Sequence, residues 1–131
     1  MRFVSVLFVV MAAAALVAGC DTLSGLTSGD CTTILIPALS VRAVDSLNGT
    51  SVIGGATVRA TDGTFVDSAV VPMDRPDLDQ GVPLAYERAG TYQVSVLRSG
   101  YRTWTQSDVR VRKTTCHVET AKLVARLVRA P

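Results

Sequence analysis

Apolar and polar side chains alternate with a period of two in several short stretches of this chain. In the first of them, Leu39, Val41 and Ala43 alternate with the polar residues Ser40 and Arg42. Because successive side chains of a β-strand point to opposite faces, this pattern is typical of a strand that is buried on one side. The stretch therefore predicts a half-buried strand.

Further strands are predicted by the same alternation. Residues 91–97 give the clearest pattern, since Tyr92, Val94 and Val96 share one face. The others are expected over residues 56–61, 64–71, 84–88, 101–106 and 109–112, and in a last segment over 116–128. We expect this last segment to begin extended at Cys116, although residues 120–129 also have the propensity for a short helix.

Turn-forming residues separate the predicted strands. The dipeptides Asn-Gly at 48–49 and Asp-Gly at 62–63 accept a positive φ at low cost. The longest expected loop, residues 72–81, contains two prolines and four charged residues. About seven short strands at this spacing predict an all-β fold, specifically a small seven-stranded antiparallel β-sandwich of immunoglobulin-like architecture.

The beginning of the chain has a different pattern. One basic residue, Arg2, is followed by an apolar run over residues 3–16 that a single serine interrupts, and two small residues precede Cys20. This arrangement is typical of a secretory signal peptide. The run is shorter than the roughly 20 residues that a membrane-spanning helix needs. We therefore expect residues 1–19 to be a signal peptide.

The residues Val-Ala-Gly-Cys at 17–20 resemble the lipobox of bacterial lipoproteins. The resemblance implies that Cys20 is acylated and becomes the first residue of the mature protein, so that lipid anchors the chain to the cell membrane or the outer membrane. Residues 20–30 are rich in Ser, Thr, Gly and Asp and predict a flexible tether of at most about 35 Å. The alternative is an ordinary signal peptide in which Cys20 is incidental or forms a disulfide.

The cysteine count agrees with an anchor at Cys20. Of three cysteines, Cys31 and Cys116 then remain as an even pair in an oxidising compartment, and we expect them to form a disulfide. Two free thiols, or a redox or metal role, are the alternative, but the chain has no CxxC motif and a single histidine. The net charge of +2 gives no electrostatic footprint for a nucleic acid partner.

Three segments together resemble the carboxypeptidase regulatory-like domain family. They are residues 54–63, 87–96 and 99–102, which contain a glycine turn, a strand beginning with tyrosine, and a second glycine turn before another tyrosine. The resemblance extends over residues 39–123 and implies a transthyretin-like (prealbumin-like) sandwich of seven strands with an accessory role in folding, stability or binding. We expect residues 31–131 to form this one domain.

Few residues suggest catalysis. The single histidine, His117, follows Cys116 directly, and neighbours on a strand point to opposite faces, so no Cys-His dyad is expected. No serine lies in a GxSxG motif, and the sequence around His117 matches neither HExxH nor HxxE. We therefore expect a surface or rim position for His117, no enzymatic activity and no cofactor.

The preferred function is that of a non-catalytic, lipid-anchored envelope protein, which acts as a structural or protein-interaction module with an envelope protein as partner. A carbohydrate- or calcium-binding module is the alternative. Asp74, Asp77 and Asp79 offer oxygen ligands for calcium, although their spacing is not that of an EF-hand. Tyr101 and Trp104 are expected on opposite faces of one strand; an exposed Trp104 would offer an aromatic platform, but we expect it to fill the core.

Overall fold

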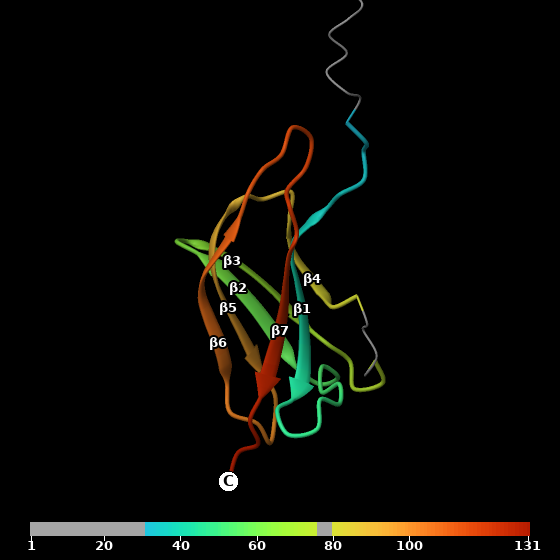
Figure 1. Ribbon diagram of the computed structural model, residues 1–131, viewed down its shortest axis with the longest axis vertical. Coiled ribbons are helices and arrows are strands. Elements are labelled where there is room, and N and C mark those ends of the chain that lie inside the picture. The colour runs from blue at the N-terminus through green and yellow to red at the C-terminus, as the bar shows by residue number, and fades with distance from the viewer. Residues whose placement is uncertain (1–30, 76–79) are drawn as a thin grey trace, which may run out of the picture. The chain divides into compact units, whose positions relative to one another are not determined.

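Seven β-strands form two sheets in the computed structural model, which describes residues 31–75 and 80–131 and contains no helix in these ranges (Figure 1). The strands are β1 (Pro37–Asp45), β2 (Thr57–Asp62), β3 (Phe65–Val70), β4 (Val82–Tyr86), β5 (Gly90–Leu97), β6 (Trp104–Val111) and β7 (Ala121–Leu127). The all-β prediction is confirmed. The helix considered for residues 120–129 does not form, while the predicted signal peptide and tether lie outside the described residues.

The two sheets face each other and share one hydrophobic core. Their strand orders are β4-β1-β7 and β3-β2-β5-β6, as Figure 1 shows. The alternating apolar residues of each sheet point inward, for example Leu39 and Val41 from β1 and Val94 and Val96 from β5, and all four are fully buried. The period of two in the sequence therefore places the core between the layers, as in a β-sandwich.

The expectation that all neighbouring strands are antiparallel is wrong for one pair. β1 and β7 run parallel, with Leu39 beside Ala121 and Asp45 beside Leu127, whereas the other four pairs are antiparallel. A short hairpin imposes antiparallel pairing on the strands that it joins, but nearly the whole domain separates β1 from β7. The first and last strands therefore lie side by side.

The boundaries predicted near β6 are also wrong. Its expected division into residues 101–106 and 109–112 is absent, because β6 continues through a register shift opposite β5. Asp108, with a φ of 58°, accommodates the extra residue as a β-bulge does. Cys116 begins no strand and lies instead in the connection between β6 and β7.

Asp45 fixes the end of the β1–β7 pair at which both strands finish. Its buried carboxylate accepts hydrogen bonds from Arg129 Nε at 2.8 Å, the Tyr101 hydroxyl at 2.9 Å and the Leu47 backbone N–H at 2.9 Å. The hydrogen bond from Arg129, followed by that from Leu47, lowers the pKa of Asp45 from 3.8 to about 2. The charged carboxylate thus joins β1 to the residues that follow β7.

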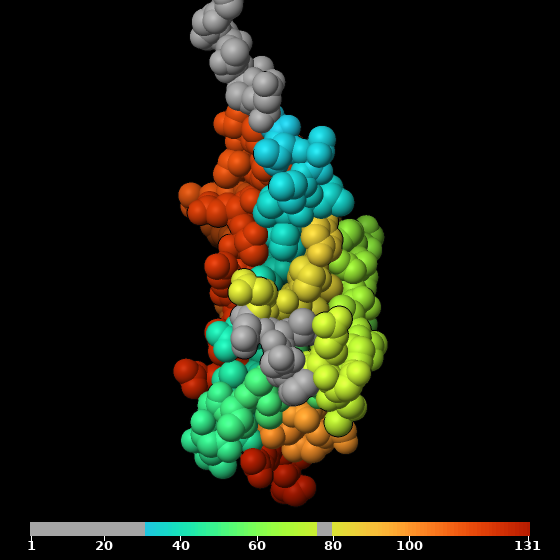
Figure 2. Space-filling view, turned by 90° about the vertical axis from the view of Figure 1, so that its right-hand side faces the viewer, coloured from blue at the N-terminus to red at the C-terminus, as the bar shows by residue number. Residues whose placement is uncertain are grey.

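At the other end of the pair, the residues before β1 lie against the β6–β7 connection. Figure 2 shows the first described residues, in cyan, beside the orange-red connection. The backbone of this connection is held by hydrogen bonds from Thr114 N to His117 O and from Glu119 N to Arg112 O. Two segments from opposite ends of the domain therefore form one surface.

We expect the Asp45→Asn variant to melt at a lower temperature than the wild type at neutral pH, because it loses the ion pair with Arg129. Folding lowers the pKa of Asp45, so its contribution is complete above the pKa in the unfolded chain and is lost as the pH falls through the folded value of about 2. The Tm difference should be constant above about pH 5 and shrink between about pH 4 and pH 2.

Circular-dichroism melts across this pH range measure the difference. Asp74→Asn, which alters an exposed aspartate, is the matched control and should melt like the wild type. A Tm difference for Asp45→Asn that does not change between about pH 5 and pH 2 would contradict the assignment of the stabilising charge to Asp45.

Candidate functional site at the disulfide end of the sandwich

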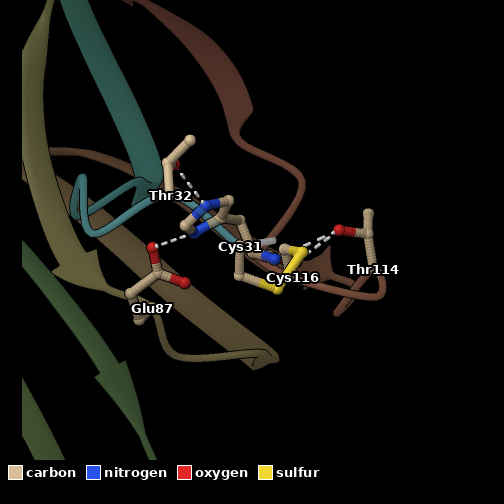
Figure 3. Close-up of a disulfide and its surroundings, with 6 residues drawn as sticks. Cys31, Thr32, Glu87, Thr114 and Cys116 are labelled. Atoms are coloured by element: carbon tan, nitrogen blue, oxygen red, sulfur yellow. Dashed lines mark hydrogen bonds and ion pairs between the residues drawn. A yellow bond between two sulfur atoms is a disulfide. The ribbon is translucent and has the colours of Figure 1, made fainter. Parts of the chain in front are cut away.

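Cys31 and Cys116 form a disulfide at the end of the sandwich where the described chain begins (Figure 3). Their Cα atoms lie 5.2 Å apart although 85 residues separate them in sequence. The bond joins the segment before β1 to the connection between β6 and β7. The pairing expected from the cysteine count is therefore confirmed.

His117, next to the disulfide, contacts residues from two other segments. Its Nδ1 lies 2.7 Å from Glu87 Oε1, and its Nε2 lies 2.9 Å from Thr32 Oγ1. A carboxylate only accepts hydrogen bonds, so the Nδ1–H of His117 donates to Glu87, and the Nε2 shares a second hydrogen bond with the Thr32 hydroxyl. In Figure 3, dashed lines mark these contacts of Thr32 and Glu87. His117 thus joins the segment before β1 to the residue after β4.

Glu87 is held in place by its backbone as well as by its side chain. Its φ of 52° is in the left-handed region, which residues with a side chain seldom occupy. Its Oε1 also accepts a hydrogen bond from the Ile36 N–H at 2.8 Å, and its own N–H donates to the Ile36 carbonyl. The Ile36 N–H, more than the contact with His117, holds the pKa of Glu87 below its usual value, although burial opposes this shift.

The turn that carries Glu87 is fixed by the next residues along the chain. The Tyr92 hydroxyl donates to the Arg88 carbonyl at 2.6 Å, and the Arg88 guanidinium pairs with Asp62 at 2.6 Å. The same guanidinium lies 4.1 Å from the centre of the Phe65 ring, in a cation–π contact. The β4–β5 turn is therefore attached to the β2–β3 hairpin, and this attachment positions the Glu87 carboxylate.

Thr32, His117 and Glu87 have the order of hydroxyl, imidazole and carboxylate that hydrolytic triads use. This arrangement was not predicted from the sequence, because Thr32 and Glu87 lie 85 and 30 residues from His117. One signal was present: a bond between Cys31 and Cys116 brings the residues that follow them, Thr32 and His117, close together. No comparable signal in the sequence points to Glu87.

An open hollow of about 340 Å³ lies beside these three residues. It is also lined by Ile34 and Leu35, which precede β1, and by Lys113 from the β6–β7 connection. Ile34 and Leu35 are each 65% exposed, and Lys113 is exposed as well. This end of the sandwich therefore presents aliphatic and cationic side chains around a polar centre.

The residues proposed for calcium binding are only partly described. Asp74 is exposed, and Asp77 and Asp79 lie outside the described residues, as does Cys20. Within residues 31–75 and 80–131, no group of three or more His, Cys, Asp or Glu side chains is placed to hold a metal ion. The described structure thus adds nothing in favour of a calcium loop.

The two aromatic residues near β6 do not point to opposite sides. Trp104 is the first residue of β6. Trp104 and Tyr101 are both half-buried, and both pack against the core. The expectation of opposite faces was wrong because Tyr101 precedes β6 and pairs instead with Arg129 in an isolated bridge. Trp104 therefore contributes to the core, as preferred, rather than to an open aromatic platform.

Comparison with known proteins assigns no family to this chain. No family model matches it, and no curated protein matches it either. The resemblances to lipoproteins and to carboxypeptidase regulatory-like domains thus remain predictions from the sequence.

Among the described residues, there is no helix that is long and apolar enough to cross a bilayer.

We expect the double variant Cys31→Ser/Cys116→Ser to lose about 4 to 5 kcal/mol of unfolding free energy, because the disulfide closes a long loop and restricts the unfolded chain. Chemical denaturation of the oxidised wild type and of the variant measures this loss. Wild-type protein kept in reductant is the control and should unfold with the variant. Equal stability of the oxidised wild type and the variant would show that the bond does not close the domain.

Proposed function

We propose that this chain is a non-catalytic lipoprotein of the bacterial cell envelope, held at a membrane by acyl chains on Cys20. One observation carries the proposal: the disulfide between Cys31 and Cys116 uses two of the three cysteines and leaves Cys20 for another role. Disulfides persist in oxidising compartments such as the periplasm, which agrees with export. The lipobox-like residues 17–20 supply the chemistry of the anchor, with the domain in the periplasm or outside the cell.

We further propose that residues 31–131 form a carboxypeptidase regulatory-like domain with a transthyretin-like sandwich, acting as a structural or protein-interaction module. Seven strands in sheets of three and four strands support this proposal. β3 offers a surface for an envelope protein partner, because it is an edge strand whose Val66 and Val70 side chains are 49% and 74% exposed. A carbohydrate-binding role has less support, since Trp104 packs against the core. A calcium-binding role rests on Asp74, Asp77 and Asp79, of which only Asp74 belongs to the described residues.

The hydrogen-bonded residues Thr32, His117 and Glu87 favour hydrolysis as a second candidate function. The same contacts have a structural explanation, because they attach the segment before β1 to the β4–β5 turn and to the β6–β7 connection. Glu87 Oε1 is also shared with the Ile36 N–H, which is a structural contact. We therefore prefer a structural role for this chain of hydrogen bonds.

Ester hydrolysis separates the two candidate functions. We expect p-nitrophenyl acetate to be hydrolysed at the same low rate by the wild type and by Thr32→Val, because the valine keeps the shape of the side chain and removes only the hydroxyl. Thr33→Val is the matched control on the neighbouring residue. A rate that falls about a hundredfold or more in Thr32→Val alone would establish a nucleophile and contradict the non-catalytic proposal.

The anchor is tested by labelling with radioactive palmitate in a bacterial host. We expect the wild type to incorporate the label and to lose residues 1–19, whereas Cys20→Ser should remain unlabelled and uncleaved, because it lacks the acylated thiol. Cys31→Ser keeps Cys20 and is the matched control, which should still be labelled. An unlabelled wild type, or a labelled Cys20→Ser variant, would overturn the anchor.

A further inference from the structure

The disulfide end of the sandwich exposes two consecutive large aliphatic side chains next to basic residues. Ile34 and Leu35 are each 65% exposed, and Lys113 lines the same hollow. Arg112 precedes Lys113 and is also exposed. A single exposed aliphatic residue is ordinary, but paired aliphatic residues with cationic neighbours are typical of surfaces that bind the membrane interface.

The segment that carries these aliphatic residues is fixed to the domain. Cys31 is joined covalently to Cys116, and the Thr32 hydroxyl is hydrogen-bonded to His117 Nε2. Beyond the two aliphatic residues, the Ile36 N–H donates to Glu87. Ile34 and Leu35 therefore lie between anchored positions, and a surface that binds them does not have to order a free chain.

Exposed basic residues also lie at this end. Arg110, Arg112 and Lys113 lie in β6 and the connection after it, against Glu87 and Glu119. The Glu87 carboxylate is already engaged by the Ile36 N–H and His117, while Glu119 lines a hollow together with Arg110 and Arg112. The exposed side chains of Arg110, Arg112 and Lys113 are complementary in charge to a surface of anionic headgroups.

The proposed anchor determines which surface this end meets. Cys20 precedes Cys31 by only eleven residues, and a fully extended chain between them spans at most about 40 Å. We propose that the disulfide end docks on the anionic lipid headgroups of the membrane that holds the anchor, with Ile34 and Leu35 inserted among them and Lys113 against phosphate. This inference rests on the proposed lipid anchor at Cys20.

The sequence supplies an internal probe, because it contains just two lysines, Lys113 and Lys122. Both are exposed, but Lys122 does not line the hollow that contains Ile34, Leu35 and Lys113, and lies beside Ser40 on the three-stranded sheet. Docking should therefore shield Lys113 from a water-soluble amine reagent and leave Lys122 accessible. Mass spectrometry after a brief acetylation gives the ratio of the two modifications in the same molecule.

The experiment uses the acylated protein in three states: in vesicles of phosphatidylcholine with phosphatidylglycerol, in vesicles of phosphatidylcholine alone, and in detergent micelles. We expect the ratio of Lys113 acetylation to Lys122 acetylation to be about fivefold or more lower in the anionic vesicles than in micelles. In the neutral vesicles, and in the anionic vesicles at high salt, this ratio should be the same as in micelles. Ile34→Ser/Leu35→Ser should remove the protection. Leu47→Ser, which alters an 84% exposed leucine in the β1–β2 connection, is the matched control and should keep it.

Each outcome separates the docking surface from the anchor. Protein that does not float with either kind of vesicle would contradict the anchor itself. Protein that floats, yet has the same Lys113 to Lys122 ratio in anionic vesicles as in micelles, would overturn the docking surface and leave the anchor standing. Protection of Lys113 that appears only when envelope proteins are added would also overturn it, because a protein partner would then cover this end.

Discussion

The parallel pairing of β1 with β7 joins the first and last strands of the sandwich, and the rest of the structure depends on it. One end of the pair is closed covalently by Cys31 and Cys116, and the other by the ion pair between Asp45 and Arg129. A domain of this size buries a modest core, so a disulfide that closes a loop of this length makes a large contribution to its stability. Strands that are distant in sequence are thus kept in one register.

The two closures differ in what they place at the surface. Asp45 is buried, and its hydrogen bonds with Tyr101 and Arg129 join the end of β1 to the residues that precede β6 and follow β7. The disulfide is at an exposed end, where it also positions the segment that carries Ile34 and Leu35. The covalent closure and the proposed membrane surface are consequently features of one segment, so stability and function are linked there.

Local patterns predicted the parts of this structure that local physics controls. The alternation around Val41 and Val94 predicted strands and their buried faces, because one face of each strand packs on the core. The parallel pair was not predictable in this way, since it joins strands from opposite ends of the domain. The bulge in β6 was also missed, because the alternation of apolar and polar residues does not show that Asp108 adopts a positive φ. The cysteine count, by contrast, did predict a long-range contact.

The site was less predictable than the fold for the same reason. Pairing Cys31 with Cys116 could have placed Thr32 beside His117, whereas the position of Glu87 depends on a strained turn and on its contact with Ile36. No period or motif in the sequence records that turn. A site whose residues come from three separate segments can be recognised only in the folded structure.

Intact mass spectrometry of the purified protein under non-reducing conditions shows whether Cys20 bears lipid, as proposed, while the other two cysteines close the domain. We expect a chain that begins at an acylated Cys20 and contains one disulfide, between Cys31 and Cys116. A chain with an unmodified Cys20, or one in which Cys20 is disulfide-bonded, would contradict it.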